Sequence, residues 1–209
     1  MSLLRLCICI LLILSSWCYQ AKWGERLTPA TGKPPKRYIL NLDLPPQVRW
    51  TQIIQENKQD ILLLIEGSVP SYAPASARNI SYQQISEYDR IFADELQGIA
   101  NILEIPIGDV FWLNMMYDSN AFCTSLIVQD ENNNIIHARN LDYGWNDLIV
   151  KLYYDVEVYR NGELLYYGNF LGGFVGLCTG LKPYKFAISG NQRISKGITS
   201  DQQYWQAPL

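Results

Sequence analysis

The feature that most constrains the fold is a change of hydrophobic periodicity near residue 120 of this 209-residue chain. Before that point, apolar residues recur every three or four positions, which is typical of amphipathic helices. After it, short apolar or alternating runs are separated by Asn-rich and Gly-rich turns, which is typical of strands and hairpins. Because the helices precede the strands and do not alternate with them, the sequence predicts an α+β fold.

Three helices are expected in the first half, after a short strand at residues 38–42. The first helix begins near Trp50 and ends by Gly67 and Pro70, because both residues disfavour a helix interior. A loop over 68–79 precedes a helix over about 82–103 and a short one over 107–117. The broad apolar face of the last helix favours core packing and leaves association with a membrane surface as an alternative.

Two hairpins and a glycine-dense segment are expected in the second half. The first hairpin joins 123–130 to 135–142 through the turn 131–134, and the second joins 152–159 to 163–167 through an Asn-Gly turn. The glycine-dense segment 172–180 and a last strand within 184–189 follow. Residues 200–209 show no strand with a partner, so we expect the sheet to be incomplete at this end.

The first 21 residues have the pattern of a secretory signal peptide. An early cation, Arg5, precedes an apolar run over 6–14 that is short for a membrane span. An uncleaved signal anchor is the alternative, because residues 17–19 make a poor cleavage site. The glycosylation sequon Asn79-Ile80-Ser81 fits a luminal route.

Composition excludes several classes of function. The chain has 17 Lys and Arg against 20 Asp and Glu, a net charge of −3, and no run of five like charges, which argues against nucleic-acid binding. A single histidine, His137, and scattered cysteines argue against a zinc site. We therefore expect no metal and no cofactor.

Two cysteines would survive removal of the signal peptide. Cleavage near residue 21 takes Cys7, Cys9 and Cys18 with it and leaves Cys123 and Cys178 in an oxidising compartment. The two could pair with each other, or one of them could be a nucleophilic thiol.

Cys123 begins the first strand, at the junction of the helical and strand segments. A symmetric closure of the turn 131–134 would place Asp142 directly opposite Cys123, with Cβ atoms about 5 Å apart. Arg139 would then point to the other face of the hairpin and could approach the thiol only through a bulge. The alternative is an Arg–Asp surface pair near a buried cysteine. His137 has no neighbour that would make it a base, so we expect a hydrogen-bonded structural histidine.

The residues on both sides of this junction resemble one enzyme family. Asn120-Ala-Phe-Cys-Thr-Ser-Leu-Ile-Val-Gln-Asp130 and Ile136-His-Ala-Arg-Asn-Leu-Asp-Tyr143 are similar to segments of the N-acylethanolamine-hydrolysing acid amidase and acid ceramidase family. Segments 41–50, 112–117 and 173–180 resemble the same family in the same order, so the resemblance covers about residues 35–195.

The resemblance implies an N-terminal nucleophile hydrolase that cuts its own chain at Phe122-Cys123. It further implies a helical α-subunit region at 22–122 and a catalytic β-subunit region at 123–209, incomplete at its C-terminus. The latter would form the start of an αββα sandwich with antiparallel sheets. The products of cleavage would form an α/β heterodimer.

The resemblance also assigns roles to single residues. Cys123 would supply the nucleophilic thiol and, once freed, the α-amino base, while Asp142 holds that amino group and Arg139 stabilises charge near the thiol. Gln192 stands where the amidase has a glutamate, and an amide can still donate to an oxyanion or contact substrate. Cys178 stands where the amidase has a tryptophan, which indicates a core residue.

The function implied is that of a lysosomal lipid amidase that releases fatty acid and ethanolamine from N-acylethanolamines. Hydrolysis of ceramide to sphingosine and fatty acid is one alternative. A truncated chain without catalytic activity is another, because the family's later Asn and Arg would lie beyond residue 209. Bile-salt and penicillin acylases share the Cys, Arg and Asp pattern but not the helical region, and rank last.

Overall fold

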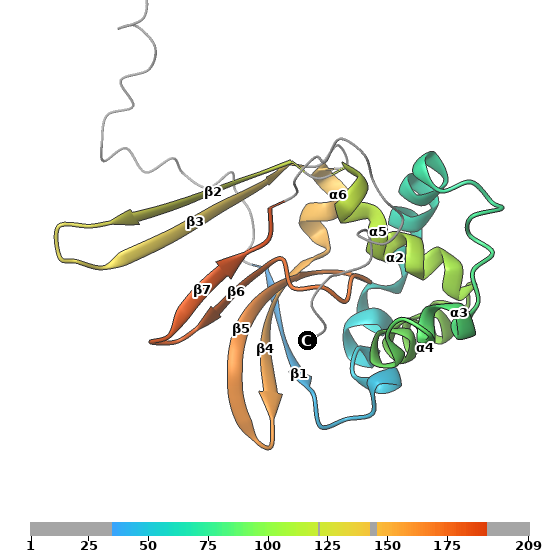
Figure 1. The fold of residues 1–209 in the computed structure, drawn as a ribbon, viewed down its shortest axis with the longest axis horizontal. Coiled ribbons are helices and arrows are strands. Elements are labelled where there is room, and N and C mark those ends of the chain that lie inside the picture. The colour runs from blue at the N-terminus through green and yellow to red at the C-terminus, as the bar shows by residue number, and fades with distance from the viewer. Residues whose placement is uncertain (1–34, 121, 143–145, 192–209) are drawn as a thin grey trace, which may run out of the picture. The chain divides into compact units, whose positions relative to one another are not determined.

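The computed structural model describes residues 35–120, 122–142 and 146–191. The segment expected to be a signal peptide lies outside these residues. The described part contains helices and two sheets, which confirms a mixed helix and sheet fold (Figure 1). The complete αββα sandwich stays a prediction.

The larger sheet has five strands in the order β1-β4-β5-β6-β7. The strands are β1 (Lys36–Asn41), β4 (Tyr153–Arg160), β5 (Glu163–Leu171), β6 (Thr179–Lys182) and β7 (Phe186–Ser189). Neighbouring strands are antiparallel except β1 and β4, which pair in parallel; the long segment between them, which holds the helices and the first hairpin, makes this crossover possible. The second sheet is the expected hairpin, β2 (Phe122–Gln129) with β3 (Ile135–Asp142).

The helical segments are η1 (Pro46–Val48), α2 (Thr51–Tyr72), α3 (Tyr82–Ser86), α4 (Arg90–Leu103), α5 (Ile107–Asn120) and α6 (Asn146–Lys151). Helices α2 to α5 group on one side of the five-stranded sheet, whereas the β2–β3 hairpin projects away from it (Figure 1). The short α6, directly after the hairpin, was not expected from the sequence.

Helix α2 continues past the residues expected to end it. Pro70 lies inside the last turn and has no N–H to donate to the Glu66 carbonyl, yet the helix continues to Tyr72. Val69 is completely buried, and the Ser68 hydroxyl donates to the Leu64 carbonyl. Burial of this turn in the core therefore outweighs the tendency of Gly67 and Pro70 to end a helix.

The helix expected over 82–103 is two helices. Asp89 adopts an extended conformation, and its side chain accepts a hydrogen bond from Phe92 N at 3.0 Å, so that it caps a new helix, α4. Ser81 and Gln84 form a capping box at the start of α3. The apolar residues keep helical spacing across the break, which is why periodicity alone missed it.

The apolar faces of the helices pack into one core with the sheet. Trp50 lies edge-on against Phe170, with ring centroids 5.6 Å apart. Leu96 of α4 and Met116 of α5 are completely buried. The structure therefore gives no support to membrane association through these faces, and no helix among the described residues is long and apolar enough to span a bilayer.

Asn114 joins helix α5 to the loop after β5. Its amide nitrogen donates to Val110 O and Gly173 O, both at 2.9 Å, and its amide oxygen accepts from Val175 N at 2.7 Å. The side chain is 1% exposed. This one amide therefore satisfies backbone groups that no solvent reaches.

We expect Asn114→Ala to lower the free energy of unfolding by about 2–4 kcal/mol, because buried backbone groups lose their partners. Asn101→Ala, on the exposed side of α4, is the matched control. Urea unfolding monitored by circular dichroism measures both. Equal losses in the two variants would contradict a structural role for Asn114.

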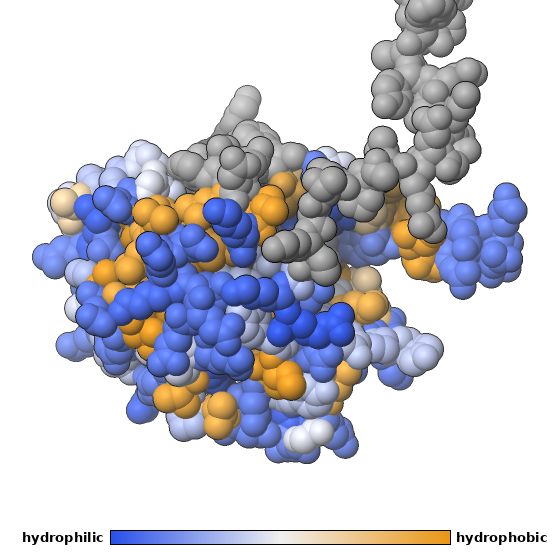
Figure 2. All heavy atoms as spheres, turned by 180° about the vertical axis from the view of Figure 1, so that it is seen from behind, coloured by the Kyte–Doolittle hydropathy of each residue, from blue (hydrophilic) through white to orange (hydrophobic). Residues whose placement is uncertain are grey.

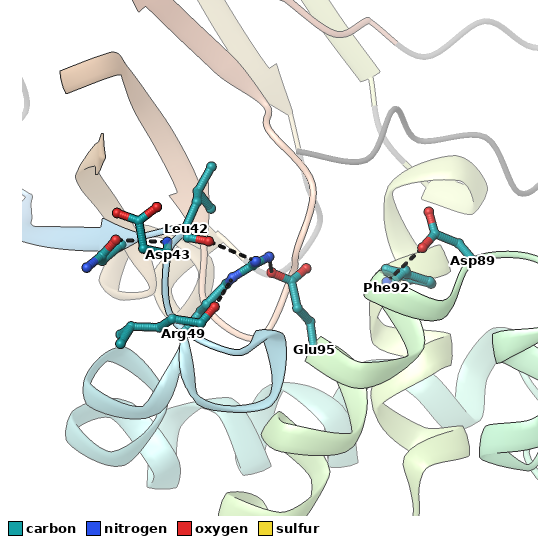
Figure 3. A network of polar contacts seen from close by, with 8 residues as sticks. Leu42, Asp43, Arg49, Asp89, Phe92 and Glu95 are labelled. Carbon is teal, nitrogen blue, oxygen red and sulfur yellow. Dashed lines mark hydrogen bonds and ion pairs between the residues drawn. The ribbon is translucent and has the colours of Figure 1, made fainter. Parts of the chain in front are cut away.

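Arg49 ties the segment after β1 to helix α4. Its guanidinium donates to Leu42 O at 3.0 Å and Leu44 O at 2.9 Å and pairs with Glu95 at 3.2 Å (Figure 3). The side chains of Arg49 and Glu95 are only 10% and 4% exposed. Burial raises the pKa of Glu95, although Arg49 opposes this effect.

This raised pKa predicts a pH-dependent contribution to stability. A carboxyl group whose folded pKa exceeds its unfolded value of 4.5 contributes stability below that value, and the contribution is lost as pH rises through the folded pKa. The wild-type chain should therefore gain stability relative to Glu95→Gln as pH falls from neutral toward 4.5. Urea unfolding of both chains across this range measures the difference, and a difference that does not vary with pH would contradict the raised pKa.

Candidate active site at the start of the β2–β3 hairpin

The hairpin turn sets the geometry of this site. Asp130 N donates to Asn134 O at 2.9 Å and Asn133 N to Asp130 O at 3.1 Å, so the loop contains only residues 131–133. Asn133 has φ +65°, the left-handed residue that three-residue loops require. The turn is therefore one residue shorter than expected, and the register moves by one.

The expected pairing of Cys123 with Asp142 is wrong for this reason. Cys123 lies opposite Leu141, and Phe122 lies opposite Asp142. Arg139 lies opposite Ser125. Ser125 is two residues after Cys123, so the side chains of Cys123, Ser125 and Arg139 lie on the same face of the hairpin. Arg139 and Cys123 thus share a face without any bulge, and Arg139 Nη2 lies 3.3 Å from Cys123 Sγ.

Contacts with the larger sheet hold the guanidinium in place. Arg139 Nη2 donates to Gly190 O at 2.6 Å, and Nη1 lies 3.4 Å from Thr179 Oγ1. The planar group therefore links the hairpin to the start of β6 and the end of β7. A guanidinium fixed beside the sulfur can stabilise negative charge that develops there when the sulfur attacks a carbonyl.

The remaining predicted site residues are only partly described. The backbone of Asp142 pairs with that of Phe122, and the two side chains lie outside the described part of the structure. Gln192 also lies outside it. Their assigned roles stay predictions.

Sequence reasoning did not assign Tyr153 or Thr179 to this site. With Arg139 they line a cavity of about 250 Å³, whose other walls are Leu141, Ile149, Val150 and Asn169. The lining combines the apolar side chains of Leu141, Ile149 and Val150 with polar groups of Arg139, Asn169 and Thr179. The glycine pattern of residues 172–180 gives no sign that this segment carries Thr179, the first residue of β6, into the site.

Cys178, just before β6, is close enough to Arg139 for the guanidinium to affect its thiol. It is 4% exposed, as expected for a core residue, and burial raises the pKa of its thiol. The hydroxyl of Tyr153 is next to it, and burial likewise raises the pKa of Tyr153 well above its usual range. Both groups therefore keep their protons under ordinary conditions.

His137 is hydrogen-bonded, as expected. Its Nε2 lies 3.0 Å from Ser189 Oγ, which lies 2.8 Å from Ser125 Oγ. Ser125 Oγ in turn donates to Asn191 Oδ1 at 3.0 Å. This polar row joins the hairpin face to β7 alongside Arg139.

The described residues contain no group of three or more His, Cys, Asp or Glu that could hold a metal ion. The chemistry available at this face is that of a thiol beside a guanidinium.

Asn79 is exposed in the loop before α3. We expect a single glycan there when the chain is made in a secretory pathway, because the acceptor amide is on the surface. Treatment with an N-glycosidase should shift the wild-type protein on a gel and leave Asn79→Gln unchanged. A wild-type chain with no shift would contradict the prediction.

Comparison with known proteins shows which proteins this chain resembles. The family described as "beta subunit of N-acylethanolamine-hydrolyzing acid amidase" matches residues 33–74. The chain is 32% identical to N-acylethanolamine-hydrolyzing acid amidase of Cavia porcellus, over 76% of this chain and 46% of that protein. It is 32% identical to the Mus musculus amidase, over 90% of this chain and 52% of that protein. It is 30% identical to a probable acid ceramidase of Caenorhabditis elegans, over 85% of this chain and 50% of that protein.

A solved structure of the Caenorhabditis elegans N-acylethanolamine-hydrolyzing acid amidase ortholog is 30% identical. The match covers 42% of this chain and 89% of that chain, with a TM-score of 0.35. The chain spans about half the length of the curated relatives it matches. These sequence matches show that N-acylethanolamine-hydrolyzing acid amidases and acid ceramidases, which are amidohydrolases, are homologues of this chain over most of its length.

Proposed function

We propose that this protein hydrolyses the amide bond of N-acylethanolamines and releases fatty acid and ethanolamine. The observation that carries the proposal is the contact between Cys123 Sγ and Arg139 Nη2, at the start of the strand that follows the helical region. The printed names of the amidase relatives support the choice of substrate.

The proposed reaction begins with cleavage of the chain between Phe122 and Cys123. The freed α-amino group, with a reference pKa near 8, then accepts the thiol proton. Asp142 holds this amino group, and Arg139 stabilises negative charge beside Sγ. Gln192 is the candidate contact for the substrate or its oxyanion.

Cys123 Sγ attacks the amide carbonyl carbon, and a tetrahedral oxyanion forms. Collapse of this intermediate breaks the C–N bond, and the amine takes a proton as it leaves. Water then attacks the acyl-thioester, releases the fatty acid and restores the thiol. The cavity beside Arg139 offers apolar walls to the part of the substrate next to the carbonyl.

The proposal also covers the cellular location of the protein and its subunit composition. The protein would reach the lysosome by the secretory pathway and work there as a heterodimer of the two cleavage products. The family description, which names one subunit, supports the two-part assembly.

Ceramide is the second candidate substrate, because a probable acid ceramidase matches the chain almost as well as the amidases do. The test is to incubate the purified protein at acidic pH with N-palmitoylethanolamine or N-palmitoylsphingosine and to measure released palmitate by mass spectrometry. Release from the first substrate supports the proposal, and release from the second alone replaces it with a ceramidase. Release from neither would support the reading as an inactive form.

A further inference from the structure

The Arg139 guanidinium lies beside the free thiol of Cys123, and a carbonyl group next to the larger sheet holds it there. Arg139 Nη2 lies 3.3 Å from Cys123 Sγ and donates to Gly190 O at 2.6 Å. Gly190 directly follows β7, and its N–H donates to Cys178 O at 3.0 Å, which fixes it to the larger sheet. The place of the Gly190 carbonyl relative to the β2–β3 hairpin therefore helps to determine where the guanidinium lies.

The hydroxyl of Ser125 contacts both residues that flank Gly190. Its Oγ lies 2.8 Å from Ser189 Oγ and donates to Asn191 Oδ1 at 3.0 Å. Ser125 also lies opposite Arg139 in the hairpin, so the two side chains are neighbours on one face. One hydroxyl of β2 therefore holds the chain on both sides of the carbonyl that accepts from Arg139.

The hydrogen bonds of this polar row have one direction. A hydroxyl has a single proton to donate, and Ser125 donates it to the Asn191 amide oxygen, which only accepts. Ser189 must therefore donate to Ser125. His137 Nε2, 3.0 Å from Ser189 Oγ, must then donate to Ser189. The row runs from His137 through the two serines to Asn191, and Ser125 is the member that connects the hairpin to both sides of Gly190.

The outer part of the hairpin extends away from the rest of the protein. Figure 2 shows an apolar stretch that leads to a polar tip on this projecting segment, and the side chains of Ile127 and Ile135 are 68% and 67% exposed. On the same face, Ser125 and His137 meet Ser189 at the end of β7. These hydrogen bonds therefore help to set the orientation of the hairpin on the larger sheet.

We propose that Ser125 is a positioning residue for Arg139. Its hydroxyl fixes the two residues that flank Gly190, and the Gly190 carbonyl fixes the guanidinium beside the Cys123 sulfur. The consequence for catalysis rests on the proposed function, in which Arg139 stabilises charge that develops at the sulfur. A small displacement of such a group lowers the rate of the reaction while the substrate still binds.

The kinetic test compares Ser125→Ala with Ser125→Thr in the full chain. Alanine removes the hydroxyl, whereas threonine keeps it and suits a strand. With N-palmitoylethanolamine we expect Ser125→Ala to lower kcat by about 10- to 100-fold with little change in KM, and Ser125→Thr to restore kcat. Ser189→Ala breaks the same row and should lower kcat in the same way. Thr124→Ala, on the opposite face of the hairpin, should leave kcat unchanged.

NMR of the guanidinium nitrogens of Arg139 tests its position without any substrate. The signals are identified by their loss in Arg139→Lys. A guanidinium held at both Nη atoms rotates slowly about its Nε–Cζ bond, so the wild type and Ser125→Thr should give separate Nη signals. In Ser125→Ala we expect these signals to merge.

Separate Nη signals in Ser125→Ala would overturn the inference, even if kcat falls, because the hydroxyl would then act in another way. In an active protein, a wild-type kcat in Ser125→Ala would also overturn it. Thermal unfolding shows whether each variant is folded, and Ser189→Ala serves as the test variant if Ser125→Ala is not. Merged signals in a protein that releases no palmitate would leave the positioning of Arg139 standing while the proposed function fails.

Discussion

Replacing Cys123 with Ala should abolish fatty-acid release, with a loss on the order of 10⁴-fold or more, because nucleophile and base are both removed. The matched control is Thr124→Ala, the next residue of β2, whose exposed side chain points to the opposite face of the hairpin. Release of palmitate from N-palmitoylethanolamine measures both variants. Activity that survives in Cys123→Ala would remove the thiol from the mechanism.

Replacing Arg139 with Lys should lower the rate on the order of 10²–10³-fold, the loss typical when a group that stabilises developing negative charge is removed. A single ammonium cannot meet Cys123, Gly190 and Thr179 at once, as the planar guanidinium does. The side chain would lose its fixed position beside the sulfur even though its charge is kept.

The control for this variant is Arg160→Lys, at the exposed end of β4. Initial rates are compared at equal concentrations of folded protein, which thermal unfolding establishes. Arg139→Lys with the wild-type rate would show that charge alone matters and that the geometry of the guanidinium does not.

The element types followed well from sequence patterns, because each depends on local periodicity. The helical first half, both hairpins and the final strand are present where expected, with different ends. The predicted ends of the helices were wrong where burial in the core or a capping side chain determines where a helix begins or ends. Val69 holds the last turn of α2 in the core, and Asp89 divides one periodic segment into α3 and α4.

The pairing register could not be predicted because one backbone angle decides it. A left-handed Asn133 shortens the loop to three residues, and three consecutive asparagines, 132–134, give no signal for which of them adopts that conformation. This one-residue change of register places Arg139 on the same face of the hairpin as Cys123, whereas the sequence predicted the opposite face. Cys178 and Tyr153 come close to this face only through the larger sheet, so no local pattern could reveal them.

The central claim is that Cys123 becomes the first residue of a catalytic subunit. Denaturing gel electrophoresis and intact mass of the secreted wild-type protein, before and after incubation at acidic pH, test it most directly. We predict two fragments that separate between Phe122 and Cys123, and a single uncut chain in the Cys123→Ala variant. A wild-type chain that stays whole, or one that is cut at another bond, would contradict the account.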